Sequence, residues 1–393
     1  DDHKRFVFRI RPGIFFADDP AFKGQRRELT AADYVYAVKR HYDPKYKSPN
    51  LFQLENARIL GLTELRRKAI ADKLPFPYDT EVEGLRTLDR YSFEVRLAQP
   101  APRFAYLFAD GAVMGAVARE VIEAYPDKTM EHPVGTGPFR LTQWRRSAKI
   151  VLERNPNYRN DPYDEQPAAD DAGAQAIARQ LAGRRLPLVD RVEVSIIEET
   201  QPRWLAFLNG DHDMMERLPN EFASIAMPNN RLAPHLAKRR MRMERVPLVD
   251  STFVYFGMEH PVVGGYTPDR VALRRALSLA YDNEREIERL RRGQAVPAQS
   301  IVPPLLSGYD PKLKTEMNQY DVARARALLD LYGYTDRDGD GWRDLPDGQP
   351  LLLEYSAQPD QLSRTQQELW QKAMNAIKVR IEFKIAKWPE QLK

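Results

Sequence analysis

Residues 131–144, which read EHPVGTGPFRLTQW, constrain the fold more than any other stretch of the sequence. Two glycines one residue apart allow backbone conformations with positive φ, and Pro133 and Pro138 stiffen the flanks. Apolar and polar side chains then alternate from Phe139, and again over residues 149–152 after a polar reversal. The pattern predicts a turn that leads into an antiparallel hairpin. A phosphate-binding loop is disfavoured, because a preceding strand, a following helix and a third glycine are missing.

The length and composition favour a chain with more than one core. It has 393 residues, 42% of them hydrophobic, whereas single cores stop growing near ~250 to 300 residues. No apolar run reaches the ~18 to 20 residues that span a bilayer. The absence of cysteine excludes disulfides, thiolate metal sites and cysteine nucleophiles. The net charge of +4 is spread in pairs of basic residues, which favours solvated faces over a surface for nucleic acid or lipid.

Periodicity predicts further elements on both sides of the hairpin. A capping box at Thr30 and Asp33 starts a helix, and residues 161–185 have the composition of a surface insertion or mobile loop. A helix over 320–332 is expected to turn Ala323, Ala327, Leu328 and Leu331 inward. The other expected elements are strands at 6–10, 91–97, 192–196, 252–258, 351–355 and 379–385, and helices at 202–209, 267–280 and 364–377.

Two stretches resemble a known family. PVGTGPFRL at 133–141, followed by ERNPNY at 153–158, is similar to the signature of the peptide and nickel class (family 5) of extracellular solute-binding proteins. VALRRALSLAYD at 271–282, continuing to GQAVP at 293–297 and IVPP at 301–304, is a second and more specific match. The resemblance implies an α/β, two-lobed periplasmic-binding-protein fold of type II, cluster C-like, with an extra subdomain in the first lobe.

The resemblance also implies the domain limits. Residues 1–130 would form the inserted subdomain of the first lobe, 131–250 its sheet domain and 251–393 a partial second lobe. Family members continue beyond this point, and no signal peptide precedes the first strand. We therefore expect a fragment truncated at both ends.

The function that the resemblance implies is capture of a peptide or similar extended solute between two lobes that close by a hinge. The protein would be a monomer without enzymatic activity or nucleic-acid partner. It would be periplasmic or extracellular, and associated with the inner membrane through an ABC permease. Searches for serine-hydrolase, zinc-protease, P-loop and dinucleotide motifs find none. A secreted hydrolase that uses scattered carboxylates, or a basic nucleic-acid or lipid-surface module, are the alternatives left open.

Ligand contacts are expected in three places. The family's cleft is lined by an aromatic segment of the first lobe, by a strand just past the crossover and by a basic residue of the second lobe. Arg364 could pair with a peptide carboxylate or could simply solvate the helix that it opens. The predicted residues are Phe108, Asp110 and Met114; Tyr255, Phe256 and Met258; and Arg364.

An acidic stretch has the spacing of a calcium loop. Asp336, Asp338, Asp340, Trp342 and Asp347 match positions 1, 3, 5, 7 and 12 of such a loop. The last position is a short Asp instead of a bidentate Glu, and a proline precedes it where a helix should begin. A solvated turn is therefore favoured, with a structural calcium as the alternative, and no other cofactor is expected.

Overall fold

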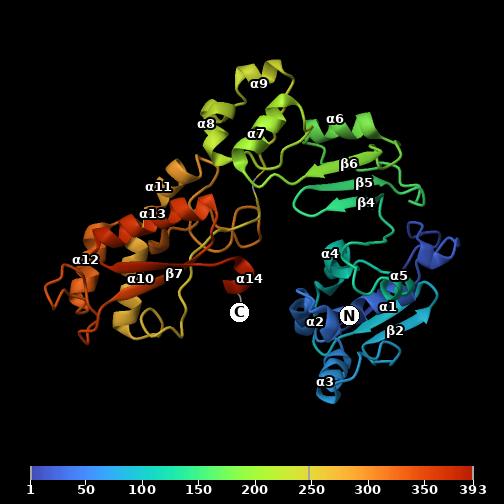
Figure 1. Ribbon diagram of the computed structural model, residues 1–393, viewed down its shortest axis with the longest axis horizontal. Coiled ribbons are helices and arrows are strands. Elements are labelled where there is room, and N and C mark those ends of the chain that lie inside the picture. The colour runs from blue at the N-terminus through green and yellow to red at the C-terminus, as the bar shows by residue number, and fades with distance from the viewer. Residues whose placement is uncertain (1, 247, 392–393) are drawn as a thin grey trace. The chain divides into compact units, whose positions relative to one another are not determined.

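The computed structural model describes residues 2–246 and 248–391 and divides into two compact units, Asp1–Glu198 and Glu199–Lys393. Both units combine helices and sheet (Figure 1). The boundary that we predicted near residue 250 lies inside the second unit, and the assignment of residues to lobes stays a prediction.

The first unit opens with a three-stranded antiparallel sheet in the order β1-β3-β2. The central strand buries Phe93 and Val95 against the helices of this unit. The predicted strands at 6–10 and 91–97 are confirmed. The elements are β1 (Arg5–Arg9), η1 (Pro20–Phe22), α1 (Ala31–Tyr42), η2 (Pro44–Tyr46), α2 (Leu51–Ala57), α3 (Leu62–Asp72), β2 (Leu85–Asp89), β3 (Ser92–Arg96), η3 (Phe104–Ala109), α4 (Gly111–Met114) and α5 (Arg119–Ala124).

Helix α1 begins at the predicted capping box. The backbone N–H of Thr30 donates to the carboxylate of Asp33 at 2.7 Å, which satisfies a donor that the helix itself leaves open. Asp33 is buried and also accepts from Arg27 at 2.6 Å. The buried carboxylate is therefore paired and hydrogen-bonded, as burial of a charge requires.

The predicted hairpin forms the start of a second sheet. Strands β4 (Phe139–Arg145), β5 (Lys149–Arg154) and β6 (Arg191–Ser195) pair antiparallel in that order. The expected positive φ at the glycines is wrong, since neither Gly135 nor Gly137 has one. Hydrogen bonds to their carbonyl groups hold the turn instead, and the left-handed residue is Ser147, in the hairpin reversal, at φ 53.

Residues 161–185 contain a helix that the sequence did not reveal. Helix α6 (Ala172–Leu181) begins where the side chain of Asp171 accepts from the N–H of Ala174 at 2.8 Å. No residue of α6 is buried. The mobile-loop prediction is therefore wrong for these ten residues, because an alanine-rich sequence and a capping aspartate favour a helix.

The second unit begins with a small group of helices. Helix α7 (Thr200–Asn209) ends at Gly210, at φ 86, as the predicted C-terminal glycine requires. The helices η4 (Asn220–Phe222), α8 (Ala223–Ala226), η5 (Pro228–Asn230) and α9 (Pro234–Lys238) follow. Among them Trp204, Ala226, Ala233 and Leu236 form a separate buried cluster.

The apolar strand predicted over 252–258 is absent. Within the described residues, 251–257 have no regular structure and pair with no strand. Phe253 and Tyr255 are 63% and 76% exposed. The prediction fails because a strand needs a hydrogen-bonded neighbour, and the apolar pattern does not supply one.

A parallel β-α-β arrangement forms the core of the second unit. Strands β7 (Leu352–Ala357) and β8 (Arg380–Ile385) are parallel neighbours, with α13 (Gln361–Ala376) between them in the chain. Leu353, Met374 and Val379 are buried in the common core. The predicted strands and helices in this region are confirmed. The elements are α10 (Pro268–Ala280), α11 (Asn283–Arg285), η6 (Glu286–Leu290), η7 (Glu316–Asn318), α12 (Val322–Leu331), β7 (Leu352–Ala357), α13 (Gln361–Ala376), β8 (Arg380–Ile385) and α14 (Trp388–Gln391).

The predicted inward face of α12 is largely wrong. Ala325 and Leu329, four residues apart, are fully buried against the core that α10 shares. Leu328 is half-buried, whereas Ala323, Ala327 and Leu331 are exposed. Helical periodicity identified the helix, but packing on α10 selected a different stripe of its surface.

Candidate functional site

A surface hollow of about 650 Å³ lies in the first unit, beside η3 and α4. Tyr106 projects at its edge with 73% of its surface exposed, and Arg103 and Asp110 add one cation and one anion. The lining residues are Gln53, Arg103, Tyr106, Leu107, Asp110 and Val113. An open hollow with few polar groups around apolar side chains is suited to a solute that is partly apolar and partly charged.

The first predicted segment supplies both the lining and the underside of this hollow. Asp110 is at the surface, whereas Met114 is only 2% exposed. Phe108 is half-buried, and its ring centroid lies 4.2 Å from that of Phe8 on β1. Asp110 therefore lines the hollow, whereas Phe108 and Met114 pack the segment onto the sheet. Their contact with a solute stays a prediction.

Sequence reasoning missed Tyr106, Arg103 and Gln53. The segment Phe104–Ala109 is a 3₁₀ helix, in which residues three apart share a face. Phe104 and Leu107 therefore point inward, and Tyr106 points outward. Reading residues 104–109 with a period of three would have found Tyr106, but Gln53 is distant in sequence and gave no signal.

A partly buried histidine contacts the backbone of a residue that lines the hollow. His41 Nε2 lies 2.6 Å from the carbonyl oxygen of Val113, and Nδ1 lies 2.7 Å from Ser48 Oγ. Because a carbonyl oxygen only accepts, Nε2 carries the proton and Nδ1 accepts from the hydroxyl group. Burial lowers the pKa of His41, which keeps the ring neutral near pH 7. The neutral ring fixes the backbone of Val113 to α1.

The second predicted segment is the unpaired stretch of the second unit. Tyr255 is 76% exposed and Met258 is 37% exposed, whereas Phe256 packs partly against the core of the unit. The carbonyl group of Met258 accepts from the N–H of Gly265 at 2.9 Å, which closes a turn. The three side chains lie on one continuous segment, and their role as ligand contacts stays a prediction.

Arg364 lies in the first turn of α13, where its guanidinium group is held locally. Nη1 donates to the carbonyl oxygen of Pro359 at 3.0 Å, and Nη2 donates to Gln361 Oε1 at 2.7 Å. These bonds match the role of a residue that caps the helix entry. Pairing with a peptide carboxylate would require exchange of these bonds, and it stays a prediction.

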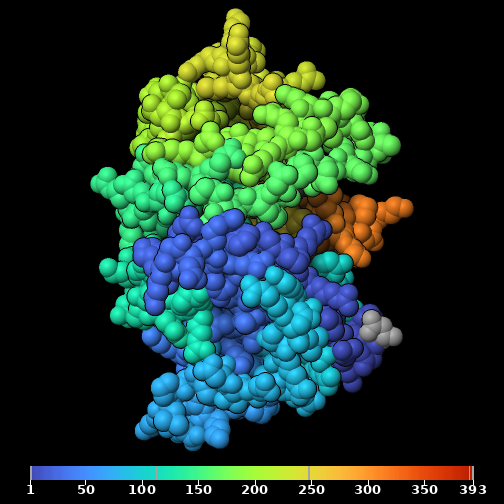
Figure 2. Space-filling model, turned by 90° about the vertical axis from the view of Figure 1, so that its right-hand side faces the viewer, coloured from blue at the N-terminus to red at the C-terminus, as the bar shows by residue number. Residues whose placement is uncertain are grey.

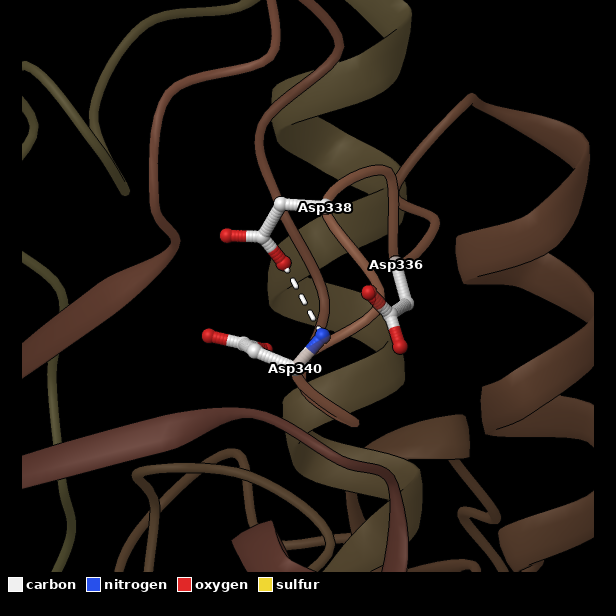
Figure 3. Close-up of side chains that lie close together, drawn as sticks. All are labelled: Asp336, Asp338 and Asp340. Atoms are coloured by element: carbon white, nitrogen blue, oxygen red, sulfur yellow. Dashed lines mark hydrogen bonds between the residues drawn. The ribbon is translucent and has the colours of Figure 1, made fainter.

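The acidic loop brings three of its five predicted ligands together. One carboxylate oxygen from each of Asp336, Asp338 and Asp340 lies within 4.8 Å of the others (Figure 3). Asp336 accepts from the N–H groups of Gly339 and Gly341 at 2.8 and 2.9 Å. Both glycines have positive φ, at 82° and 89°, so the tight turn depends on them.

The other features of this loop favour a turn held by its own hydrogen bonds. Asp347 does not belong to the group and accepts from the N–H of Gln349 at 3.1 Å. The N–H of Trp342 donates to Asp340 at 2.9 Å, and the guanidinium group of Arg380 pairs with the same carboxylate. These two contacts lower the pKa of Asp340. Calcium binds carboxylate oxygens, but the guanidinium group of Arg380 already balances the charge of the Asp340 carboxylate. The solvated turn therefore stays the prediction, and calcium binding stays its alternative.

Comparison with known proteins identifies the fold. The profile of the family described as "Bacterial extracellular solute-binding proteins, family 5 Middle" matches residues 1–393. A solved structure of a periplasmic binding protein from Helicobacter pylori, DppA in complex with a peptide, superposes with a TM-score of 0.67 at 18% identity. That match covers 100% of this chain and 64% of the other, and at this identity it shows the fold alone. The predicted α/β periplasmic-binding-protein fold is confirmed.

Two curated relatives have similar sequences. The probable deoxycholate-binding periplasmic protein YgiS of Escherichia coli is 25% identical over 341 residues, and the periplasmic oligopeptide-binding protein OppA of Salmonella typhimurium is 25% identical over 342. Each match covers 85% of this chain and 53% of the relative, so the chain spans about half the length of these relatives. Both names denote binding proteins. Among the described residues, no helix has the length and apolarity needed to cross a membrane.

Proposed function

The chain belongs to family 5 of the bacterial extracellular solute-binding proteins, and from this premise we propose that it captures a peptide or a similarly extended solute for an ABC transporter. The observation that carries the proposal is the family match, which extends over residues 1–393. The relative named for oligopeptides and the peptide complex of the Helicobacter pylori DppA structure support a peptide as the solute class.

The hollow in the first unit supplies suitable chemistry for part of this task. A peptide offers backbone donors and acceptors along its length and a charge at each end. Extended peptides are bound chiefly through these main-chain groups. Arg103 and Asp110 present charges of both signs beside the hollow, and the Tyr106 ring offers apolar contact area. We assign Asp110 and Tyr106 to solute contact in the first unit.

The rest of the proposal concerns the whole protein. Residues 1–250 and 251–393 would belong to two lobes that close on the solute by a hinge, with Tyr255, Phe256, Met258 and Arg364 contributing from the second. The partner would be a permease in the inner membrane, the location periplasmic or extracellular, and the protein a monomer. Binding and delivery require no catalytic group, so we propose no enzymatic activity and no nucleic-acid partner.

A thermal-shift and calorimetry screen of the protein, expressed from its complete reading frame, tests this proposal. A peptide at about 100 times its Kd should stabilise the folded state by about 2.7 kcal/mol. Tyr106→Ala and Asp110→Asn should each weaken binding at least ~10-fold, which is the effect of losing about 1.4 kcal/mol. Tyr266→Ala and Asp72→Asn are matched controls, because both residues are exposed and outside the hollow.

Three results would contradict the proposal. If no peptide in a broad panel raised the melting temperature, peptides would be excluded as the solute class. Equal peptide affinity of Tyr106→Ala, Asp110→Asn and their controls would show that the hollow is not the binding site. Release of cleavage products from the peptides would support the hydrolase alternative instead.

A further inference from the structure

The helices at the start of the second unit form a small cap with its own core. The cap comprises α7, α8 and α9 and the turns between them (Figure 1). The ring of Trp204 stacks on that of Phe222 at 5.6 Å between centroids, and Leu236 of α9 is 2% exposed beside them. Because this inner side is apolar, the polar residues of α9 and of the segment after it face solvent.

The last part of the cap and the segment after it are strongly basic. Residues 231–245 contain six Lys and Arg side chains and one carboxylate, Glu244, whereas the whole chain has 60 Lys and Arg among 393 residues. All six cations are exposed. They are Arg231, Lys238, Arg239, Arg240, Arg242 and Arg245, and we call them the basic cluster.

The fold does not neutralise the basic cluster. In the part of the chain that the structure describes, none of the six cations lies within 4.0 Å of a carboxylate. Arg239 donates to the carbonyl oxygen of Leu208, and Arg245 donates to Asn230 Oδ1 at 3.0 Å. Neither bond offsets a positive charge. Residues 284–292 are different, since four arginines accompany three glutamates there and Arg291 pairs with Glu286 at 2.9 Å.

A role in helix stability accounts for little of this charge. Lys238 lies in the last turn of α9, where a positive charge interacts favourably with the helix dipole. Arg242 and Arg245 lie beyond the helix, in a segment without regular structure. Close like charges repel one another and so oppose folding. The cluster therefore has the properties of a surface for an external anion.

Exposed aliphatic side chains continue the same segment. Val246, Leu248 and Val249 are 73%, 57% and 54% exposed and directly follow the cluster. Figure 2 shows the yellow part of the cap at the top of the view, where side chains project from the surface. Cations beside exposed aliphatic groups suit a membrane surface, which attracts the cations to lipid phosphates and accepts the aliphatic groups between the headgroups.

We propose that the basic cluster, together with Val246, Leu248 and Val249, binds the surface of a bilayer that contains anionic phospholipids. An acidic protein partner would neutralise the charges of the basic cluster. It would not explain why three aliphatic side chains beside the cluster are exposed. This surface shares no residue with the candidate solute site, and the inference does not depend on the proposed function.

Co-sedimentation with large unilamellar vesicles tests the inference on the whole chain. Vesicles of phosphatidylcholine alone are compared with vesicles that contain about one third phosphatidylglycerol. We expect at least ~10-fold stronger partitioning to the anionic vesicles, and loss of this preference at about 0.5 M salt, because salt screens exposed charges. The double variant Val246→Ser, Leu248→Ser should partition about threefold less while keeping its salt dependence.

A charge-reversal pair separates the cluster from total charge. The test variant is Lys238→Glu, Arg240→Glu, Arg242→Glu, because these side chains make no hydrogen bond or ion pair in the described structure. The control is Arg67→Glu, Lys68→Glu, Lys73→Glu, at exposed positions in and after α3. Each variant changes the net charge from +4 to −2, since each reversal replaces a positive charge by a negative one and so lowers the net charge by two. We expect at least ~10-fold weaker partitioning for the test variant and less than about twofold for the control.

The melting temperature of each variant is measured first, so that a change in vesicle partitioning is interpreted only for folded protein. Equal partitioning of the wild type to neutral and anionic vesicles overturns the inference, whatever the variants do. An equal loss in the control variant also overturns it, because total charge would then explain the binding. Absence of vesicle binding overturns it in favour of a protein partner or a solvated face.

Discussion

The turn before β4 depends on a buried side chain, and we predict that its removal destabilises the first unit. Asn155 is 2% exposed. Its Nδ2 donates to the carbonyl oxygen of Gly137 at 2.9 Å, and its Oδ1 accepts from the N–H of Asn157 at 3.0 Å. Asn155→Ala removes both bonds. It leaves the backbone bond from the N–H of Asn155 to the carbonyl oxygen of Pro138 in place.

The magnitude follows from the two lost bonds. Each intramolecular hydrogen bond contributes about 0.5 to 1.5 kcal/mol net, so the free energy of unfolding should fall by about 2 kcal/mol. For a unit of this size that loss lowers the melting temperature by about 4 to 8 °C. Asn155→Asp should cost at least as much at pH 7, because the carboxylate cannot donate to Gly137. Asn160→Ala is the matched control, since Asn160 is exposed and makes no hydrogen bond in the described structure.

Calorimetry gives the melting temperature, and hydrogen exchange locates the effect. In Asn155→Ala, amide exchange should become faster in β4 and β5 and stay unchanged in α13, which belongs to the other unit. A melting temperature within about 1 °C of the wild type, with unchanged exchange in β4 and β5, would refute the idea that Asn155 holds the turn.

Three further predictions concern single residues. Calcium in excess should leave the melting temperature unchanged, because Arg380 already pairs with Asp340; a rise that Asp340→Ala abolishes would show instead that the loop holds the ion. Arg364→Ala in the protein from the complete reading frame should weaken peptide affinity by roughly 1.5 to 3 kcal/mol, and unchanged affinity for both a free peptide and its C-terminal amide would exclude the carboxylate contact. Burial lowers the pKa of His41, so its stabilising contribution is present above about pH 6.5 and is lost as the pH falls. The stability advantage of the wild type over His41→Gln in urea denaturation should shrink between about pH 8 and pH 5, and an advantage independent of pH would contradict this reasoning.

Local pattern was sufficient for much of the fold. The hairpin of β4 and β5, helix α10 after Thr267, and the separate elements β7, α13 and β8 were all predicted from alternation, helical spacing and capping residues. These features depend on residues a few positions apart, so the sequence contains the information directly. The motifs at 133–141 and 271–282 indicated the family in the same way, because they are contiguous.

Partners distant in sequence were decided only by the tertiary structure. Periodicity found α12, but contact with α10 determined that Ala325 and Leu329 are buried. The apolar stretch at 252–258 had the composition of a strand, yet no neighbour pairs with it in the described residues. An apolar pattern specifies that a surface avoids water, but it does not specify which surface will cover it.

The candidate site shows the same limit. His41 and Val113 are 72 residues apart, and Gln53 reaches the hollow from another helix, so neither could be assigned from spacing. The basic cluster is a run of charges in the sequence, but only the structure showed that no carboxylate of the described residues pairs with it. The sequence determined which residues carry charge and which avoid water. The tertiary structure decided which of them meet, because contacts between distant segments depend on how the elements pack.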